Sequence, residues 1–248
     1  MELMTVTASV PGPVWDFPSI FTVAEAADVS WAVFPDQGGY PTKFYKSLSA
    51  APGNSNVFPP NAFIPMAKAG TLPRVCYVWS PAGYDEHPPH VSTPDYVTKG
   101  QNLVWDRVQA VIDGGGWEET TFILTWDDWD GYADSVPTPV IETVPDRLHP
   151  DGFAVIGGSR IPLIMFGRTV PQRIDPEWHS HASIPKTVMD LPGLPPMGVP
   201  RVDDAPSPAS LLDVMLDRSA PPEPGAVIGQ PAPPHPTPAP VPLKPPRI

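Results

Sequence analysis

Two adjacent carboxylates, Asp127 and Asp128, directly follow an apolar run in the stretch "TFILTWDDWDGYADSVPTP". Neighbouring strand residues point to opposite faces, so the two acids share one site only where the strand breaks into a loop, and Gly131 supplies such a break. Carboxylates held together repel one another unless a cation compensates, and a hard divalent cation takes oxygen ligands. The residues alone leave two interpretations open, an exposed acidic turn and a metal site, of which the acidic turn is the commoner.

The chain has 6 histidines, of which two lie in sequence contexts that suit chemistry. His87 stands in "DEHPP" and His181 in "SHASIPK". An imidazole there could protonate a leaving group or contact an anionic substrate. On its own, however, such a histidine is more often a solvated loop residue or a packing residue. We assign no function to the remaining four, which are His90, His149, His179 and His235.

The elements that must position these residues alternate between strands and helices. Four short apolar runs predict buried strands, at 30–34, 74–80, 120–126 and 160–167. Four stretches between and around them predict helices, at 20–29, 61–70, 102–116 and 183–191. This alternation predicts an α/β fold with an open, mostly parallel sheet flanked by helices. Ligands bind off the carboxyl ends of the strands in such sheets, which is where Asp127 and Asp128 stand.

Composition limits the function classes further. The 248 residues carry a net charge of −12, so the overall field does not attract nucleic acid or an anionic membrane. Cys76 is the only cysteine, which excludes an internal disulfide and a thiolate metal site. No apolar run approaches the ~18 residues of a membrane span, and the start resembles no signal peptide. These features leave the compartment open.

The last 30 residues, 219–248, contain 12 prolines. Proline breaks helices and cannot donate to a sheet, so we expect a disordered tail biased to polyproline II, following a folded region at 1–218. Such a tail suits a partner with an aromatic groove, although a simple spacer is the commoner interpretation.

Three blocks resemble the bacterial phosphoesterase family: "GTLPRVCYVWSPAGYDEHPP", "WEETTFILTWDD" and "HASIPKTVMDLPGLPPMGVPRVDDAP". The family includes phospholipases C and certain acid phosphatases, within the alkaline-phosphatase-like superfamily of α/β folds. The blocks occur in the family's order, and the resemblance covers roughly residues 1–217. It implies a phosphoester substrate and a divalent metal ion of unknown identity. By this resemblance Asp127 and Asp128 bind the metal, while His87 and His181 contact the phosphoryl or leaving group.

The sequence departs from the family pattern in three places. The family's early metal-binding Glu-Asn pair and its Ser or Thr nucleophile find no match, and "MELMTVTAS" resembles the stretch that follows them, so Thr5, Thr7 and Ser9 are expected to be structural. Asp130 replaces a family glycine, and Ser135 replaces the histidine of an "Asp-His-Val" motif.

These departures suggest a domain truncated at its N-terminus, because hydrolysis in this family needs the hydroxyl nucleophile. The expected function is therefore metal-dependent phosphoester hydrolysis that is weak or absent in the isolated chain. Two other accounts also fit: Met1 as an internal methionine mistaken for the start, and a separately encoded N-terminal piece that complements the chain. The alternative is a non-catalytic remnant or interaction module that acts through the proline-rich tail.

Overall fold

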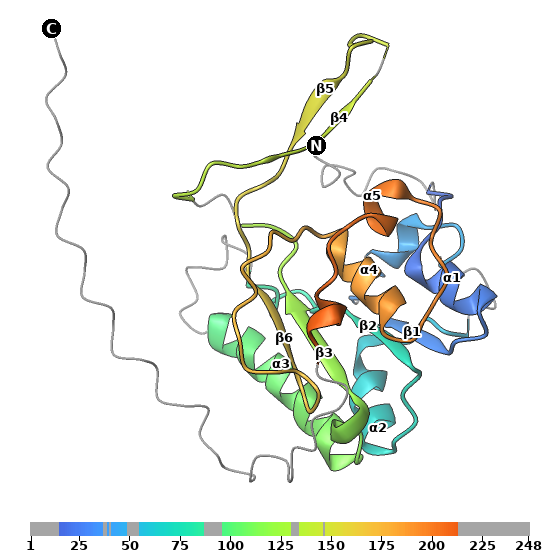
Figure 1. The fold of residues 1–248 in the computed structure, drawn as a ribbon. Helices are drawn as coiled ribbons and strands as arrows, with labels where there is room; N and C mark the ends of the chain where they lie inside the picture. Colours follow the sequence, from blue (N-terminus) through green and yellow to red (C-terminus); the bar gives the residue numbers. More distant parts are fainter. Residues whose placement is uncertain are drawn as a thin grey trace, which may run out of the picture. The chain divides into compact units, whose positions relative to one another are not determined.

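The structure is a computed structural model that describes residues 15–36, 39, 41–48, 55–86, 96–129, 134–145 and 147–212. The chain divides into two units, Met1–Leu216 and Asp217–Ile248. The described residues all belong to the first unit, and the elements below are those of Figure 1. His87, His90, Asp130, His235 and the tail at 219–248 lie outside the described residues.

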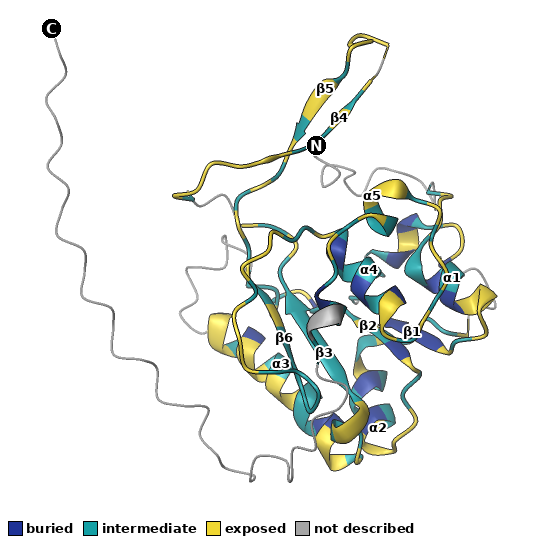
Figure 2. Cartoon of the chain, in the orientation of Figure 1, coloured by how far each residue is buried: buried dark blue, intermediate teal, exposed yellow. Residues whose placement is uncertain are grey.

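The first part of the fold is a parallel strand pair that packs against a short helix. Helix α1, Ile20–Ala26, begins with a capping box in which Ser19 and Thr22 each accept from the backbone N–H of the other. Strand β1, Trp31–Phe34, then pairs in parallel with β2, Val75–Val78. All four residues of β1 are buried, so this strand lies at the centre of the core (Figure 2).

Two further helices cover one side of this pair. Helix α2 spans Phe63–Lys68 and α3 spans Tyr96–Asp113, and their residues share a hydrophobic cluster with β1, β2 and Phe122. Gly114 directly follows α3 and lies against α2. A Cβ there would collide with the carbonyl oxygen of Ala67. This close approach requires glycine at the crossing of the two helices.

The second part of the fold is built from antiparallel pairs. Strand β3, Thr121–Thr125, pairs with β6, Leu163–Gly167, and α3 lies alongside them (Figure 1). Between them the chain forms a hairpin of β4, Val140–Val144, and β5, Phe153–Ile156. An ion pair between Glu142 and Arg201 connects β4 with α5, Pro200–Asp203. Much of the hairpin is exposed (Figure 2).

The remaining elements are short. Helix α4 spans Ser183–Asp190 and contacts α1, α5 and the last 3₁₀ turn. The 3₁₀ turns among the described residues are η2, η3, η5 and η6, at Thr42–Phe44, Pro60–Ala62, Trp117–Glu119 and Pro208–Leu211.

All eight predicted elements are present, but their arrangement differs from the expected one. Described strands form three two-stranded sheets, of which only β1–β2 is parallel, so a mostly parallel alkaline-phosphatase-like sheet is not shown. The runs at 120–126 and 160–167 pair antiparallel, and the described residues between them form a hairpin rather than the helix that usually connects parallel strands. The β4–β5 hairpin that joins them was not predicted from the sequence. What the structure supports is an α/β fold.

Candidate functional site

The site lies where β3 ends. The pairing of β3 with β6 stops at Thr125, whose hydroxyl donates a hydrogen bond to the carbonyl oxygen of Pro162 at 2.9 Å. Trp126 follows outside the strand, and Asp127 and Asp128 form the bend after it. The predicted acids therefore stand at the carboxyl end of their strand, at the point where it turns into a loop.

Trp126 is held from two sides by residues distant in sequence. Its indole Nε1–H donates to Oε2 of Glu86 at 3.1 Å, and its carbonyl oxygen lies 3.1 Å from Nε2 of His181. The structure thus brings His181, which comes two residues before α4, to the residue that precedes Asp127.

The contact with Trp126 defines the protonation of the His181 ring. A carbonyl oxygen only accepts hydrogen bonds, so Nε2 of His181 must carry the hydrogen. In the neutral ring the lone pair then belongs to Nδ1, which has no hydrogen-bond partner in the described part of the chain. His181 is exposed, so this nitrogen is available to a ligand.

The two acids differ in their surroundings. Asp127 is exposed, whereas Asp128 is half-buried. Their carboxylate oxygens are the donors that a hard cation prefers. Nevertheless, no group of three or more His, Cys, Asp or Glu side chains suited to a metal gathers within the described residues. The donors among the described residues therefore fit a metal in kind but not in number.

Glu86 reaches the site from the loop after β2, in an unusual backbone conformation. Its φ of 58° lies in the left-handed region, which residues with a side chain rarely adopt. Its carboxyl group lies against α3, where a Cβ on Gly100 would come within 2.2 Å of Oε1. Glu86 therefore fills the space between a glycine of α3 and the indole of Trp126.

Asp134, which begins the "Asp134-Ser135-Val136" motif, is engaged by an arginine. Both Nε and Nη2 of Arg160 donate to its carboxylate, at 3.0 Å to Oδ2 and 2.7 Å to Oδ1. The backbone N–H groups of Arg160 and Val136 add bonds of 2.8 and 3.1 Å. These hydrogen bonds, those from Arg160 first, hold the pKa of Asp134 well below its usual range. Asp134 thus closes the base of the β4–β5 hairpin.

A carboxylate–imidazole pair lies just before His181. Nε2 of His179 is 2.7 Å from Oδ2 of Asp175, and Nδ1 of His179 is buried without a partner among the described residues. The backbone N–H of Glu177 and then His179 lower the pKa of Asp175. This pair fixes the loop that leads to α4.

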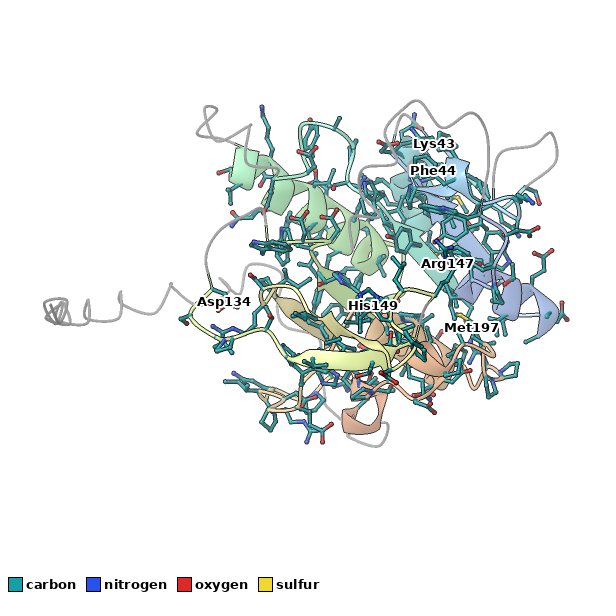
Figure 3. The ribbon with its side chains drawn as sticks, turned by 90° about the horizontal axis from the view of Figure 1, so that it is seen from above. Lys43, Phe44, Asp134, Arg147, His149 and Met197 are labelled. Carbon is teal, nitrogen blue, oxygen red and sulfur yellow. The ribbon has the colours of Figure 1, made fainter. Side chains whose placement is uncertain are left out.

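His149 lies at the tip of the hairpin, where its ring centroid is 5.6 Å from that of Phe153. Figure 3 shows Asp134 well apart from Arg147 and His149. The structure therefore brings together His181 and the end of β3, and it leaves His149 elsewhere.

Comparison with known proteins assigns the chain to a family. A sequence model described as "Phosphoesterase family" matches residues 12–195, which is more than half of the chain. The chain belongs to the phosphoesterase family. The resemblance noted in the sequence is thereby confirmed at the level of the family.

Among the relatives of this chain are proteins of Arabidopsis thaliana. Non-specific phospholipase C3 is 31% identical over 163 residues, which cover 60% of this chain and 29% of that protein. Non-specific phospholipase C4 is 31% identical over 149 residues, covering 50% of this chain and 26% of its own length. Non-specific phospholipase C1 is 31% identical over 153 residues, covering 50% and 26%. The chain thus spans less than a third of the length of these relatives.

Sequence reasoning missed two residues that contact the candidate residues, Glu86 and Arg160. Glu86 directly precedes His87 in "DEHPP", and this place beside a candidate histidine was a signal. Nothing in the sequence indicated that Glu86 contacts Trp126. Arg160 is 26 residues from Asp134 and carried no signal of its own. Within the described residues no helix is long and apolar enough to cross a membrane.

Proposed function

We propose that this chain carries part of the active site of a metal-dependent phosphoric ester hydrolase, of the phospholipase C or acid phosphatase type. The observation that carries the proposal is the contact between Nε2 of His181 and the carbonyl oxygen of Trp126, directly before the acids. An imidazole bound to the residue that directly precedes two carboxylates offers groups that phosphoryl-transfer chemistry uses.

In this proposal Asp127 and Asp128 bind a divalent cation, which would neutralise negative charge on the phosphoryl oxygens. His181 binds a phosphoryl or leaving-group oxygen, and His87 does the same from the "DEHPP" loop. All-oxygen ligands suit Mg²⁺, Ca²⁺ or Mn²⁺, and the imidazoles also admit Zn²⁺ or Fe²⁺.

The 248 residues by themselves are expected to hydrolyse phosphoesters weakly or not at all. The hydroxyl nucleophile that the family resemblance requires has no match among them. Within the described residues, the possible metal ligands also do not form a complete set. An added segment that supplies the nucleophile is expected to raise the rate.

The test combines metal binding with turnover on the purified chain. Mn²⁺ binding is measured by titration calorimetry, and hydrolysis is followed with p-nitrophenyl phosphate and its phosphorylcholine ester. We expect Asp127→Ala and Asp128→Ala each to abolish Mn²⁺ binding, while Asp151→Ala, which removes an exposed carboxylate of the hairpin turn, leaves it unchanged.

The possible results separate the parts of the proposal. Mn²⁺ binding that requires Asp127, with little turnover, supports a phosphoesterase site that is incomplete in this chain. Strong turnover that Asp127→Ala abolishes supports the site and overturns the expected weakness. A wild-type chain that binds no divalent cation overturns the metal site.

The competing function is that of a non-catalytic interaction module. The composition of residues 219–248, with 12 prolines in 30, favours it as a second candidate. Capture of an SH3 or WW domain by the intact chain, lost when residues 219–248 are deleted, would support this function. Equal binding by both chains would contradict it.

A further inference from the structure

The Trp126 side chain and backbone connect two loops that the sequence places far apart. On one side the indole donates to Glu86, which is 40 residues earlier, and on the other the carbonyl accepts from His181, which is 55 residues later. Both contacts belong to the residue that comes directly before Asp127. The two contacts therefore meet on one residue, the first through its side chain and the second through its backbone.

The contact between Glu86 and Trp126 is charge-assisted and confined. A carboxylate that accepts from a neutral N–H makes a stronger hydrogen bond than a neutral acceptor does. The carboxyl group also lies close against α3, so that a Cβ at Gly100 would displace it from its present place. The left-handed backbone of Glu86 points to the same constraint, since surrounding structure must stabilise it.

We infer that Glu86 is a positioning residue for the candidate site, a conclusion that rests on the proposed function. Glu86 fixes the indole of Trp126, and the Trp126 carbonyl oxygen then holds His181 in the Nε2–H form. The Nδ1 lone pair of His181 is thereby directed to the ligand, and the bend that carries Asp127 starts from a fixed peptide. Glu86 touches neither substrate nor metal in this role.

The alternative is that Glu86 merely packs between a loop and a helix. In that case its removal changes stability alone and leaves the His181 ring as it was. Metal-ligand sites commonly depend on such outer partners, whose loss lowers metal affinity by about 10- to 100-fold. The tautomer of His181 separates the two explanations, because packing by itself does not set it.

The experiment measures the His181 tautomer on the uniformly ¹⁵N-labelled, metal-free full chain by long-range ¹H–¹⁵N correlation. The measurement is made at pH 8. His181→Asn assigns the signals among the 6 histidines. In the wild-type chain we expect a protonated Nε2 and an unprotonated Nδ1.

Two variants remove the Glu86 contact in different ways. Glu86→Leu keeps the size of the side chain but has no acceptor, and Gly100→Ala leaves Glu86 in place while its Cβ displaces the carboxyl group. In both we expect a mixture of Nε2–H and Nδ1–H forms. Glu86→Gln retains an acceptor oxygen and should keep the wild-type form. Gln101→Ala, at an exposed position of the same helix, is the matched control for Gly100→Ala.

The outcomes decide the inference independently of the metal. If both Glu86→Leu and Gly100→Ala keep the pure Nε2–H form, Glu86 is not a positioning residue. A wild-type His181 protonated at Nδ1 also overturns the inference. A separate Mn²⁺ titration of Glu86→Leu should show affinity lowered by about 10- to 100-fold. If the wild-type chain binds no Mn²⁺ but the tautomer shifts as expected, the proposed function fails and the positioning role stands.

Discussion

Asp134 shows how a single residue of a candidate motif serves structure in this chain. Its carboxylate accepts from the side chain of Arg160 and from two backbone N–H groups, so its pKa is lowered. A lowered pKa in the folded state means that the stabilising effect is present above the unfolded value of about 3.9 and is lost as the pH falls below it. Asp134 is thus ionised throughout the neutral range.

We predict that Asp134→Asn loosens the base of the hairpin at neutral pH. The amide cannot replace the charge that Arg160 binds, so the backbone N–H groups of Val136 and Arg160 should exchange with solvent faster. Hydrogen exchange measured at pH 7 checks this result. Exchange of Ala110 and Val111 in the core should be unaffected, and unchanged protection at Val136 and Arg160 would contradict the prediction.

Cys76 gives a second prediction for a single residue. Burial raises the pKa of this thiol to about 12, and its Sγ lies 3.3 Å from the carbonyl oxygen of Pro73. Only the thiolate reacts with iodoacetamide, so at pH 8 the folded chain should react about a thousand times more slowly than an unfolded thiol with a pKa of about 8.5. Mass spectrometry of native and urea-unfolded chains checks this. Equal rates would show that the thiol is accessible when folded.

The candidate residues that the sequence indicated are those whose residue type and local position suggest chemistry. Asp127 and Asp128 end an apolar run, and His181 precedes a helix, so each had a local signal. The roles of Glu86 and Arg160 depend instead on a left-handed backbone angle and on a contact across 26 residues. Neither property is readable from a local pattern, because tertiary structure creates both.

At the scale of the elements, apolar runs predicted where the strands lie but not how they pair. The run at 120–126 became β3, and its antiparallel partner β6 depends on the connection between them. That connection contains the β4–β5 hairpin, whose strands have 5 and 4 residues and carry exposed apolar side chains such as Val140 and Ile156. Such short segments without a buried face give little periodic signal.

The packing of α2 against α3 yields a prediction at this scale. Gly114 has no room for a side chain, because its Cβ would collide with the backbone of Ala67. Gly114→Ala should therefore lower the free energy of unfolding by about 1–3 kcal/mol, as overpacking does, even though alanine favours helices. Urea unfolding followed by circular dichroism measures the change. Gln101→Ala, in the exposed part of α3, serves as the control and should not destabilise the chain.

At the scale of the whole molecule, the apolar surface is distributed unevenly. The four residues of β1 are buried, whereas all five of β3 are only half-buried. The chain also covers less than a third of the phospholipases C that it resembles. Within the described residues, the proposed site draws on β3, the loop before α4 and the loop after β2.

The final prediction concerns the proline-rich segment at 219–248. With 12 prolines in 30 residues it can contribute few backbone hydrogen bonds and little packed apolar area, so it should add nothing to the stability of the first unit. Deleting residues 219–248 should leave the free energy of unfolding within about 0.5 kcal/mol of the full chain, the range of a change that touches no packed feature. Urea unfolding of both chains measures the difference. A large loss of stability would mean that this segment packs on the folded unit, whereas an unchanged value together with lost capture of an SH3 or WW domain would assign it to partner binding.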